Sequence, residues 1–173
     1  MGEPAAGPEG DPANGPATKK VTAQPLTAEA WQPFGQVIGG ADQGSAACVL
    51  ELRQDAVFHL DVLSYTWHEL RCDLLNRHHT ATQALIPLGG SPAVVVVAPP
   101  DVDFSDPSHL DTIRAFTISG SQGINLAIGT WHWGPYPTGA EVHLANFQAR
   151  DVANDNEIAH LERDLHTVVE VAV

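Results

Sequence analysis

Short runs of apolar and β-branched residues, each of strand length, follow one another through the middle of the chain. The residues from Val94 to Val97 are all β-branched, which favours a strand buried on both faces over a helix. Turn-forming residues, mostly Gly and Pro, lie between the runs. The expected strands span 47–52, 56–67, 84–87, 93–98, 113–118, 124–128 and 142–147. Many short strands at close spacing predict a mostly β domain, either a sandwich or a barrel.

The N-terminal segment, residues 1 to 18, consists mainly of Gly, Pro, Ala and acidic residues and has almost nothing to bury. Such a segment cannot offset the entropy lost on ordering, so we expect a disordered tail followed by a single domain over 19–173. Thr27 then provides a suitable helix N-cap, with Glu29 in the first turn. The sequence therefore predicts one short helix that runs through Trp31.

Apolar residues near the C-terminus recur at the spacing of an amphipathic helix. Ile158, Leu161 and Leu165 would lie on one stripe of such a helix. We therefore expect a second helix from about Asn156 to His166. Asn156 itself is expected to act as a turn or capping residue.

The charge balance narrows the classes of partner. The 173 residues carry a formal net charge of -13 and include only 8 Lys and Arg residues. Nucleic acids and anionic membranes both require a basic surface, so neither is an expected partner. The chain has no apolar run long enough to span a bilayer and no signal-peptide pattern, and its two cysteines do not suggest a disulfide framework. These features predict a cytoplasmic protein.

Candidate chemistry begins in a polar cluster between two expected strands. On an extended strand, Arg77, His79 and Gln83 would share one face, and Asn76 and His78 the other. One of the two adjacent imidazoles would then enter a barrel, unless a bulge intervenes. That imidazole is a candidate metal ligand or general base, and the guanidinium is a candidate partner for a substrate carboxylate. The alternative is an exposed polar strand edge.

A second candidate segment is Gly129-Thr130-Trp131-His132, which follows an apolar strand and precedes a Pro-rich loop. The glycine permits a tight turn, and His132 would emerge at a strand end, where functional sites are common. Trp131 and the nearby Trp133 either line a pocket, as substrate-binding residues, or pack in the core.

Both segments resemble the two motifs of the cupin family, in which histidines and a glutamate bind a divalent metal inside a β-barrel. Arg77 stands where the first histidine is expected and Gln83 where the glutamate is expected, so His79 and His132 are the remaining ligand candidates. The resemblance implies a double-stranded β-helix, or jelly-roll, barrel. The candidate cofactor is a divalent metal such as Ni, Zn or Mn, although such an ion would normally require more protein ligands than these two.

A narrower resemblance extends over most of the expected domain. In order and spacing, several segments are similar to the ureidoglycolate lyase family: 26–38, 77–78, Thr82-Gln83-Ala84-Leu85-Ile86-Pro87-Leu88, 94–98, Leu110 with 114–116, 123–125 and Gly129-Thr130-Trp131-His132. Members of that family are cupin-like homodimers that cleave ureidoglycolate to glyoxylate and urea in purine (allantoin) breakdown. The resemblance therefore implies a carbon–nitrogen lyase and a small substrate that bears a carboxylate.

The resemblance also implies roles for individual residues. His78 and His132 correspond to the acid and base, because a near-neutral imidazole suits both tasks. Arg77 would hold the substrate carboxylate, and Gln83 would position the ureido group, with Asn76 as a further substrate-binding residue. The family correspondence selects His78, whereas the cupin spacing selects His79, and both remain candidates.

Three positions depart from the family pattern. Asn76 replaces a glutamate, Trp133 a histidine and Asn146 an aspartate, and a carboxamide cannot accept a proton at neutral pH. Two alternatives therefore remain. The chain could be a diverged cupin-like protein that binds a small carboxylate, or a different lyase, decarboxylase or isomerase on the same scaffold.

Overall fold

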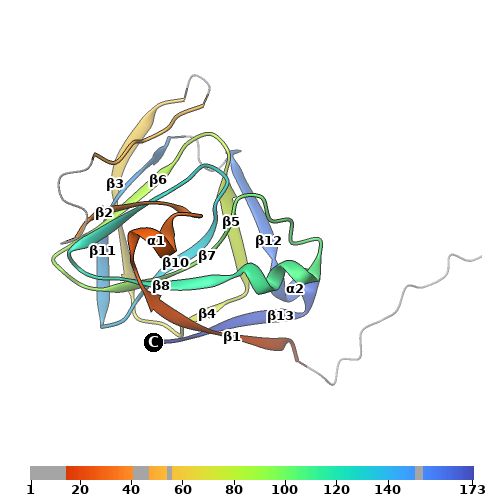
Figure 1. Ribbon diagram of the computed structural model, residues 1–173. Coiled ribbons are helices and arrows are strands. Elements are labelled where there is room, and N and C mark those ends of the chain that lie inside the picture. Colours follow the sequence, from red (N-terminus) through yellow and green to blue (C-terminus); the bar gives the residue numbers. More distant parts are fainter. Residues whose placement is uncertain (1–14, 41–46, 54–55, 151–153) are drawn as a thin grey trace, which may run out of the picture.

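Two β-sheets face each other and form a curled, barrel-like domain in the computed structural model, which describes residues 15–40, 47–53, 56–150 and 154–173 (Figure 1). The larger sheet has the strand order β12-β5-β10-β7-β8-β1-β13-β4, and the smaller sheet has the order β2-β9-β6-β11-β3. The expectation of a mostly β, cupin-like barrel is confirmed.

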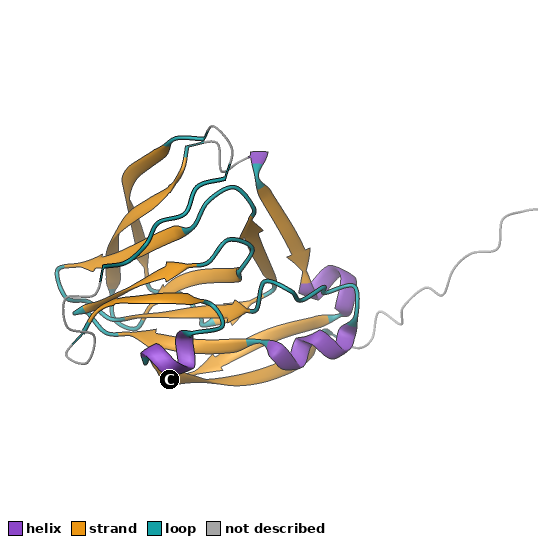
Figure 2. Ribbon diagram, turned by 45° about the horizontal axis from the view of Figure 1, so that its top comes forward, coloured by secondary structure: helices purple, strands orange, loops and turns teal. Residues whose placement is uncertain are grey.

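The strands of the eight-stranded sheet are β1 (Ala17–Pro25), β4 (Arg71–Cys72), β5 (Leu74–His78), β7 (Ala93–Ala98), β8 (Arg114–Ile118), β10 (Trp131–Pro137), β12 (Asn156–His160) and β13 (Thr167–Ala172). Those of the five-stranded sheet are β2 (Gly35–Gly39), β3 (Phe58–Thr66), β6 (Gln83–Leu88), β9 (Gln122–Leu126) and β11 (Glu141–Ala149). The helices are α1 (Ala28–Trp31), the 3-10 helix η1 (Pro107–Thr112) and α2 (Leu161–Leu165). Figure 2 shows these short helices beside the strands. Within the described ranges, none is both long and apolar enough to cross a bilayer.

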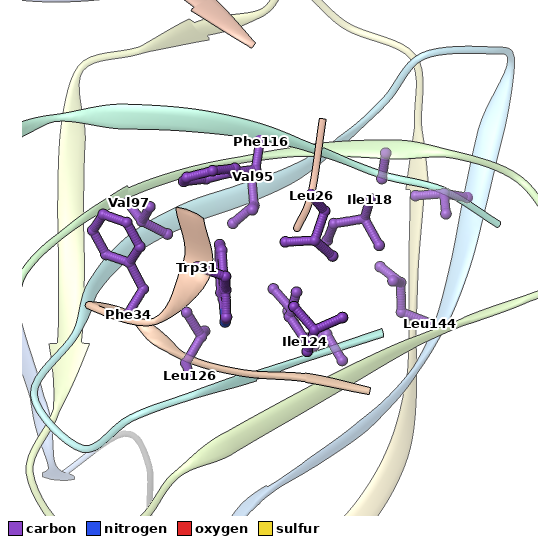
Figure 3. Packing of buried hydrophobic residues seen from close by; sticks show 14 residues of the cluster. Leu26, Trp31, Phe34, Val95, Val97, Phe116, Ile118, Ile124, Leu126 and Leu144 are labelled. Atoms are coloured by element: carbon purple, nitrogen blue, oxygen red, sulfur yellow. The ribbon is translucent and has the colours of Figure 1, made fainter. Parts of the chain in front are cut away.

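Strand β7 is buried on both faces, as its β-branched composition predicts. Val95 and Val97 belong to an inner apolar cluster between the two sheets, drawn in Figure 3. Val94 and Val96 belong to an outer cluster on the opposite face of the eight-stranded sheet. One strand therefore connects two hydrophobic cores, because its side chains alternate between them.

Helix α1 contributes the largest aromatic side chain of the inner cluster. The Thr27 hydroxyl accepts a hydrogen bond from the Ala30 N–H, as expected of the N-cap. Trp31 is fully buried, and its ring centroid lies 5.2 Å from that of Phe116 and 5.6 Å from that of Phe34. The inner cluster thus fills one part of the space between the sheets, and its Leu85 also lines the pocket described below.

The second expected helix, over 156–166, is wrong for most of its length. Residues Asn156–His160 form β12, which pairs with β5, and only Leu161–Leu165 are helical before β13 begins at Thr167. Ile158 is 42% exposed whereas Leu161 is fully buried, so the apolar stripe is not one packed helix face. Backbone pairing with β5 outweighed the weak helical periodicity.

Two expectations for the N-terminal part of the chain were a disordered tail over 1–18 and a strand over 47–52. Residues 1–14 of the expected tail lie outside the described residues, and β1 begins at Ala17, inside the segment that we expected to be disordered. Parallel pairing with β13, starting at Ala17 opposite Thr167, orders this polar strand. The expected strand over 47–52 contributes an isolated bridge between Leu52 and Ala81 instead.

Burial of β7 in two cores makes a testable prediction. We expect Val95→Ala and Val96→Ala each to lower the free energy of unfolding by about 2 kcal/mol, because each removes two buried methyl groups and leaves a cavity. Val173→Ala, at a side chain 73% exposed, is the control and should change stability by less than about 0.5 kcal/mol. Guanidinium unfolding curves measure all three. A cost at one valine alone would contradict burial on both faces.

Candidate functional site

A pocket of about 360 Å³ lies between the two sheets. Its walls come from both: β5, β10 and β12 on one side, and β3, β6 and β11 on the other. The lining residues are Leu63, Tyr65, His68, Asn76, His78, Gln83, Leu85, His132, Trp133, Gly134, Pro135, Tyr136, Gln148 and Asn156. None of these is Asp, Glu, Lys or Arg, so the pocket wall described here carries no formal charge while its histidines are neutral.

The register of three antiparallel strands brings the polar residues together. His132 on β10 is paired with Asn76 on β5, and Asn156 on β12 is paired with His78. Paired residues project from the same face of a sheet, as do residues two apart on one strand, so all four side chains reach the pocket. The Asn76 Nδ2 atom lies 3.3 Å from His78 Nε2, 3.5 Å from His132 Nε2 and 3.0 Å from Asn156 Oδ1.

His132 has the geometry of a general base. Its Nδ1 lies 2.9 Å from the Thr130 carbonyl oxygen, which can only accept, so Nδ1 carries the proton and the lone pair is on Nε2. Burial, together with the neighbouring His78, lowers the pKa of His132 from 6.5 to about 4. The ring is therefore neutral near pH 7 and presents an acceptor nitrogen toward Asn76.

His78 places a second imidazole beside the first. The two ring centroids are 5.2 Å apart, and burial lowers the pKa of His78 as well. Its Nδ1 is buried and has no hydrogen-bond partner among the described residues. Since a neutral imidazole has an acceptor nitrogen, one ring can accept a proton and pass it to the other, which can then donate it as an imidazolium.

Carboxamides form the opposite wall. Gln83, at the start of β6, donates from Nε2 to Asn146 Oδ1 at 2.9 Å and to Gln148 Oε1 at 3.2 Å. Asn146 in turn donates from Nδ2 to Asp61 Oδ1 at 2.7 Å. The Oε1 atom of Gln83 is buried without a partner in the described part of the chain. This acceptor is available to a ligand.

The predicted alternation from Arg77 to Gln83 is wrong, because these residues do not form one strand. β5 ends at His78 and β6 begins at Gln83 in the other sheet. Between them, the Asp155 carboxylate accepts hydrogen bonds from the backbone N–H groups of His79 and Thr80, at 2.9 and 2.7 Å. Because of this turn, the alternation of side chains along a single strand does not extend from His78 to Gln83, and both side chains line the pocket.

Arg77 does not line the pocket, in contrast to the expectation that it would hold a carboxylate there. Its Nε and Nη2 donate to the two carboxylate oxygens of Glu157 at 2.9 and 2.8 Å, and its Nη1 donates to the Pro100 carbonyl at 3.0 Å. The guanidinium also lies 4.2 Å from the centroid of the Trp131 ring. Its donors are directed at the protein, where they connect β12 to β5.

The two tryptophans also separate. Trp131 is buried in the outer cluster and donates from Nε1 to the Val102 carbonyl at 2.9 Å, so its expected place in the substrate pocket is wrong. It lines instead a second hollow of about 400 Å³, together with Glu157. Trp133, two residues further along β10, packs against the same outer cluster but is also among the residues that line the pocket.

His79 and His132 do not form the expected metal-ligand pair. His79 is exposed, and its Nε2 lies 2.6 Å from Glu157 Oε2, on the same side as Arg77. Within the described ranges, no group of three or more His, Cys, Asp or Glu side chains is placed to hold a metal ion. The pocket supplies two grouped imidazoles and neutral carboxamides, a donor set that does not fit a tightly held zinc or nickel ion.

Several residues of the site were missed at the level of sequence, among them Asn156, Gln148 and Asp61 and the pocket-lining His68 and Tyr65. Asn156 was expected to be a turn or capping residue, and its place in the pocket follows from the pairing of β12 with β5. Gln148 lies two residues after Asn146, so strand alternation alone would have placed it on the same face. Asp61 carries no local signal, because only the pairing of β3 with β11 brings it opposite Asn146.

Comparison with known proteins identifies the family of this chain. The family model described as "Ureidoglycolate lyase" matches residues 18–169. A protein of Burkholderia mallei (strain NCTC 10229) named ureidoglycolate lyase is 36% identical over 132 residues, covering 66% of this chain and 73% of its own. A protein of the same name in Pseudomonas fluorescens (strain Pf0-1) is 34% identical over 129 residues, which cover 66% of this chain and 75% of that protein. Another, in Pseudomonas aeruginosa (strain LESB58), is 36% identical over 124 residues, which cover 63% of this chain and 71% of that protein. The chain belongs to the ureidoglycolate lyase family.

Proposed function

We propose that this protein cleaves ureidoglycolate to glyoxylate and urea, as a step of purine (allantoin) breakdown in the cytoplasm, with His132 and His78 as base and acid. The observation that carries the proposal is the neutral His132 ring, whose Nε2 acceptor lies in the pocket between the two sheets, beside a second imidazole. The family match and the names of the relatives support the choice of substrate.

The reaction needs one proton to be taken from oxygen and one to be given to nitrogen. In ureidoglycolate the hydroxyl and the ureido nitrogen are bonded to the same carbon. His132 Nε2 accepts the hydroxyl proton, the C–O bond becomes a carbonyl, and the C–N bond breaks. The His132 imidazolium passes this proton to His78, and the His78 imidazolium donates it to the departing urea nitrogen, which leaves both rings neutral again. No net proton is consumed.

The substrate carboxylate is assigned to neutral donors, because Arg77 is bound to Glu157 outside the pocket. Asn156 uses its Oδ1 to accept from Asn76, which leaves its Nδ2 group as a donor for a ligand. The bound anion also favours the imidazolium that forms when His132 accepts a proton, since an opposite charge nearby raises the pKa of an imidazole.

Substitution of the two pocket histidines tests the assignment. We expect His132→Asn and His78→Asn each to lower kcat for ureidoglycolate by about 100-fold or more, because each removes a proton-transfer group. His79→Asn is the matched control and should retain kcat within about twofold, as His79 lies outside the pocket. Glyoxylate release above the spontaneous rate is the measurement. A wild-type protein that releases none would refute the lyase assignment, and a large loss in His79→Asn would refute the choice of His78.

The buried neutral state of His132 also predicts a pH dependence of stability. Its pKa is about 4 in the folded state and 6.5 as its ordinary value, so the unfolded chain binds more protons between these pH values. Acidification from pH 7.5 to 5.0 should therefore lower the free energy of unfolding through His132 by about 2 kcal/mol. His132→Asn should lose this contribution, so its stability falls less over the same range. Urea unfolding at both pH values measures the difference, and equal losses in the two proteins would contradict a buried neutral His132.

We also propose that the protein is a homodimer joined through the outer face of the five-stranded sheet. On β3, Leu60 and Val62 are 58% and 57% exposed, and they lie opposite Phe147 and Ala145 of β11. Leu88 on β6 is 42% exposed. An apolar sheet face of this kind suits a two-fold interface with a second copy, and the family resemblance supports the same state.

A charge in this face should separate the two copies. We expect the native protein to elute with twice the chain mass of 18.4 kDa and Val62→Glu to elute with the mass of one chain, because two buried carboxylates would face each other across the axis. Val173→Glu, at an exposed C-terminal residue, should stay dimeric. Size-exclusion chromatography with light scattering measures the mass, and a dimeric Val62→Glu would move the interface elsewhere.

A further inference from the structure

The carboxamides beside the pocket form a chain of hydrogen bonds in which each amide donates from its NH₂ group to the next residue toward Asp61. It begins at Asp61 on β3, passes through Asn146 on β11 and ends at Gln83 on β6. The two bonds are 2.7 and 2.9 Å long, and Asn146 is completely buried. All three strands are neighbours in the five-stranded sheet, so the spacing of these side chains is set by strand pairing.

The direction follows from the chemistry of Asp61. A carboxylate can only accept, so the Asn146 amide must turn its NH₂ group toward Asp61 and its carbonyl oxygen toward Gln83. The Gln83 amide must then turn its own NH₂ group toward Asn146. The opposite orientation of Gln83 would bring its Oε1 against the Asn146 Oδ1 and Gln148 Oε1 atoms, which are both acceptors here.

The end of this chain faces the pocket. Gln83 is 8% exposed and lines the pocket, and its Oε1 is buried with no partner among the described residues. A buried acceptor without a donor costs free energy, and a ligand N–H group at this point would remove that cost. A ligand with a methylene at the same point would leave it in place.

We propose that Asp61 and Asn146 are positioning residues that fix Gln83 as a hydrogen-bond acceptor, and that this acceptor makes the pocket select ligands with a ureido or amide N–H group. The inference deepens the proposed function, since it assigns the ureido group to the Gln83 side. The substrate then spans the two sheets, with its carbinol carbon at the imidazoles of β5 and β10 and its ureido nitrogens at β6.

Two isosteric ligands test this selection without catalysis. Ureidoacetate, H₂N–CO–NH–CH₂–COO⁻, keeps the ureido group but has no carbinol hydroxyl and so cannot react. Levulinate, CH₃–CO–CH₂–CH₂–COO⁻, replaces the NH₂ and NH groups by CH₃ and CH₂. We expect the native protein to bind ureidoacetate about tenfold more tightly than levulinate in isothermal titration calorimetry, since an unpaired polar group is costly.

The variants separate positioning from general damage. Asp61→Asn keeps the shape but removes the fixed direction, so the preference for ureidoacetate should fall about fivefold while levulinate binding is unchanged. The reciprocal double variant Asp61→Asn with Asn146→Asp should restore the preference. In it, the carboxylate introduced on β11 accepts from both the amide introduced on β3 and Gln83, so Gln83 is again oriented with Oε1 toward the pocket.

The outcomes distinguish this inference from the proposed function. Equal affinities for the two ligands in the native protein, or no binding of ureidoacetate, overturn the inference even if glyoxylate is released. An equal loss of both ligands in Asp61→Asn overturns the positioning role. A preference that is present and restored by the double variant, in a protein that releases no glyoxylate, supports the inference and rejects the lyase reaction.

Discussion

The antiparallel register of β5 with β10 on one side and β12 on the other is the constraint on which the site depends. It pairs Asn76 with His132 and His78 with Asn156. A shift of one residue would turn these side chains to the opposite face. Arg77 and Glu157 are paired on that opposite face, and their two hydrogen bonds connect β5 to β12. The ion pair therefore supports the pocket from outside it.

The two sheets contribute different chemistry to one neutral cavity. The eight-stranded sheet supplies imidazoles whose burial keeps them uncharged, and the five-stranded sheet supplies oriented amides. The family resemblance implies an aspartate at position 146, and the Oδ1 of Asn146 accepts from Gln83 as a carboxylate oxygen could. Because Asp61 orients the amide of Asn146, the loss of a carboxylate at position 146 does not remove the acceptor.

Local sequence was sufficient wherever one segment carried its own physical signal. The β-branched run from Val94 to Val97 predicted a strand buried on both faces, and Thr27 predicted the start of α1. The segment ending in His132 was expected at a strand end, and His132 lies near the start of β10 and lines the pocket; of the two adjacent histidines that the sequence left open, His78 lines the same pocket. The buried strand and the helix start depend on composition and capping, which are contained in contiguous residues.

Tertiary structure alone decided which side chains meet. The sequence could not separate His78 from His79, because the turn between β5 and β6 depends on hydrogen bonds to Asp155, a residue distant in the chain. It could not show that Arg77 is bound to Glu157, because periodicity assigned Glu157 to a helix. In both cases a partner far along the chain completed the hydrogen bonds, and pairing over such separations leaves no local pattern in the residues that it orders.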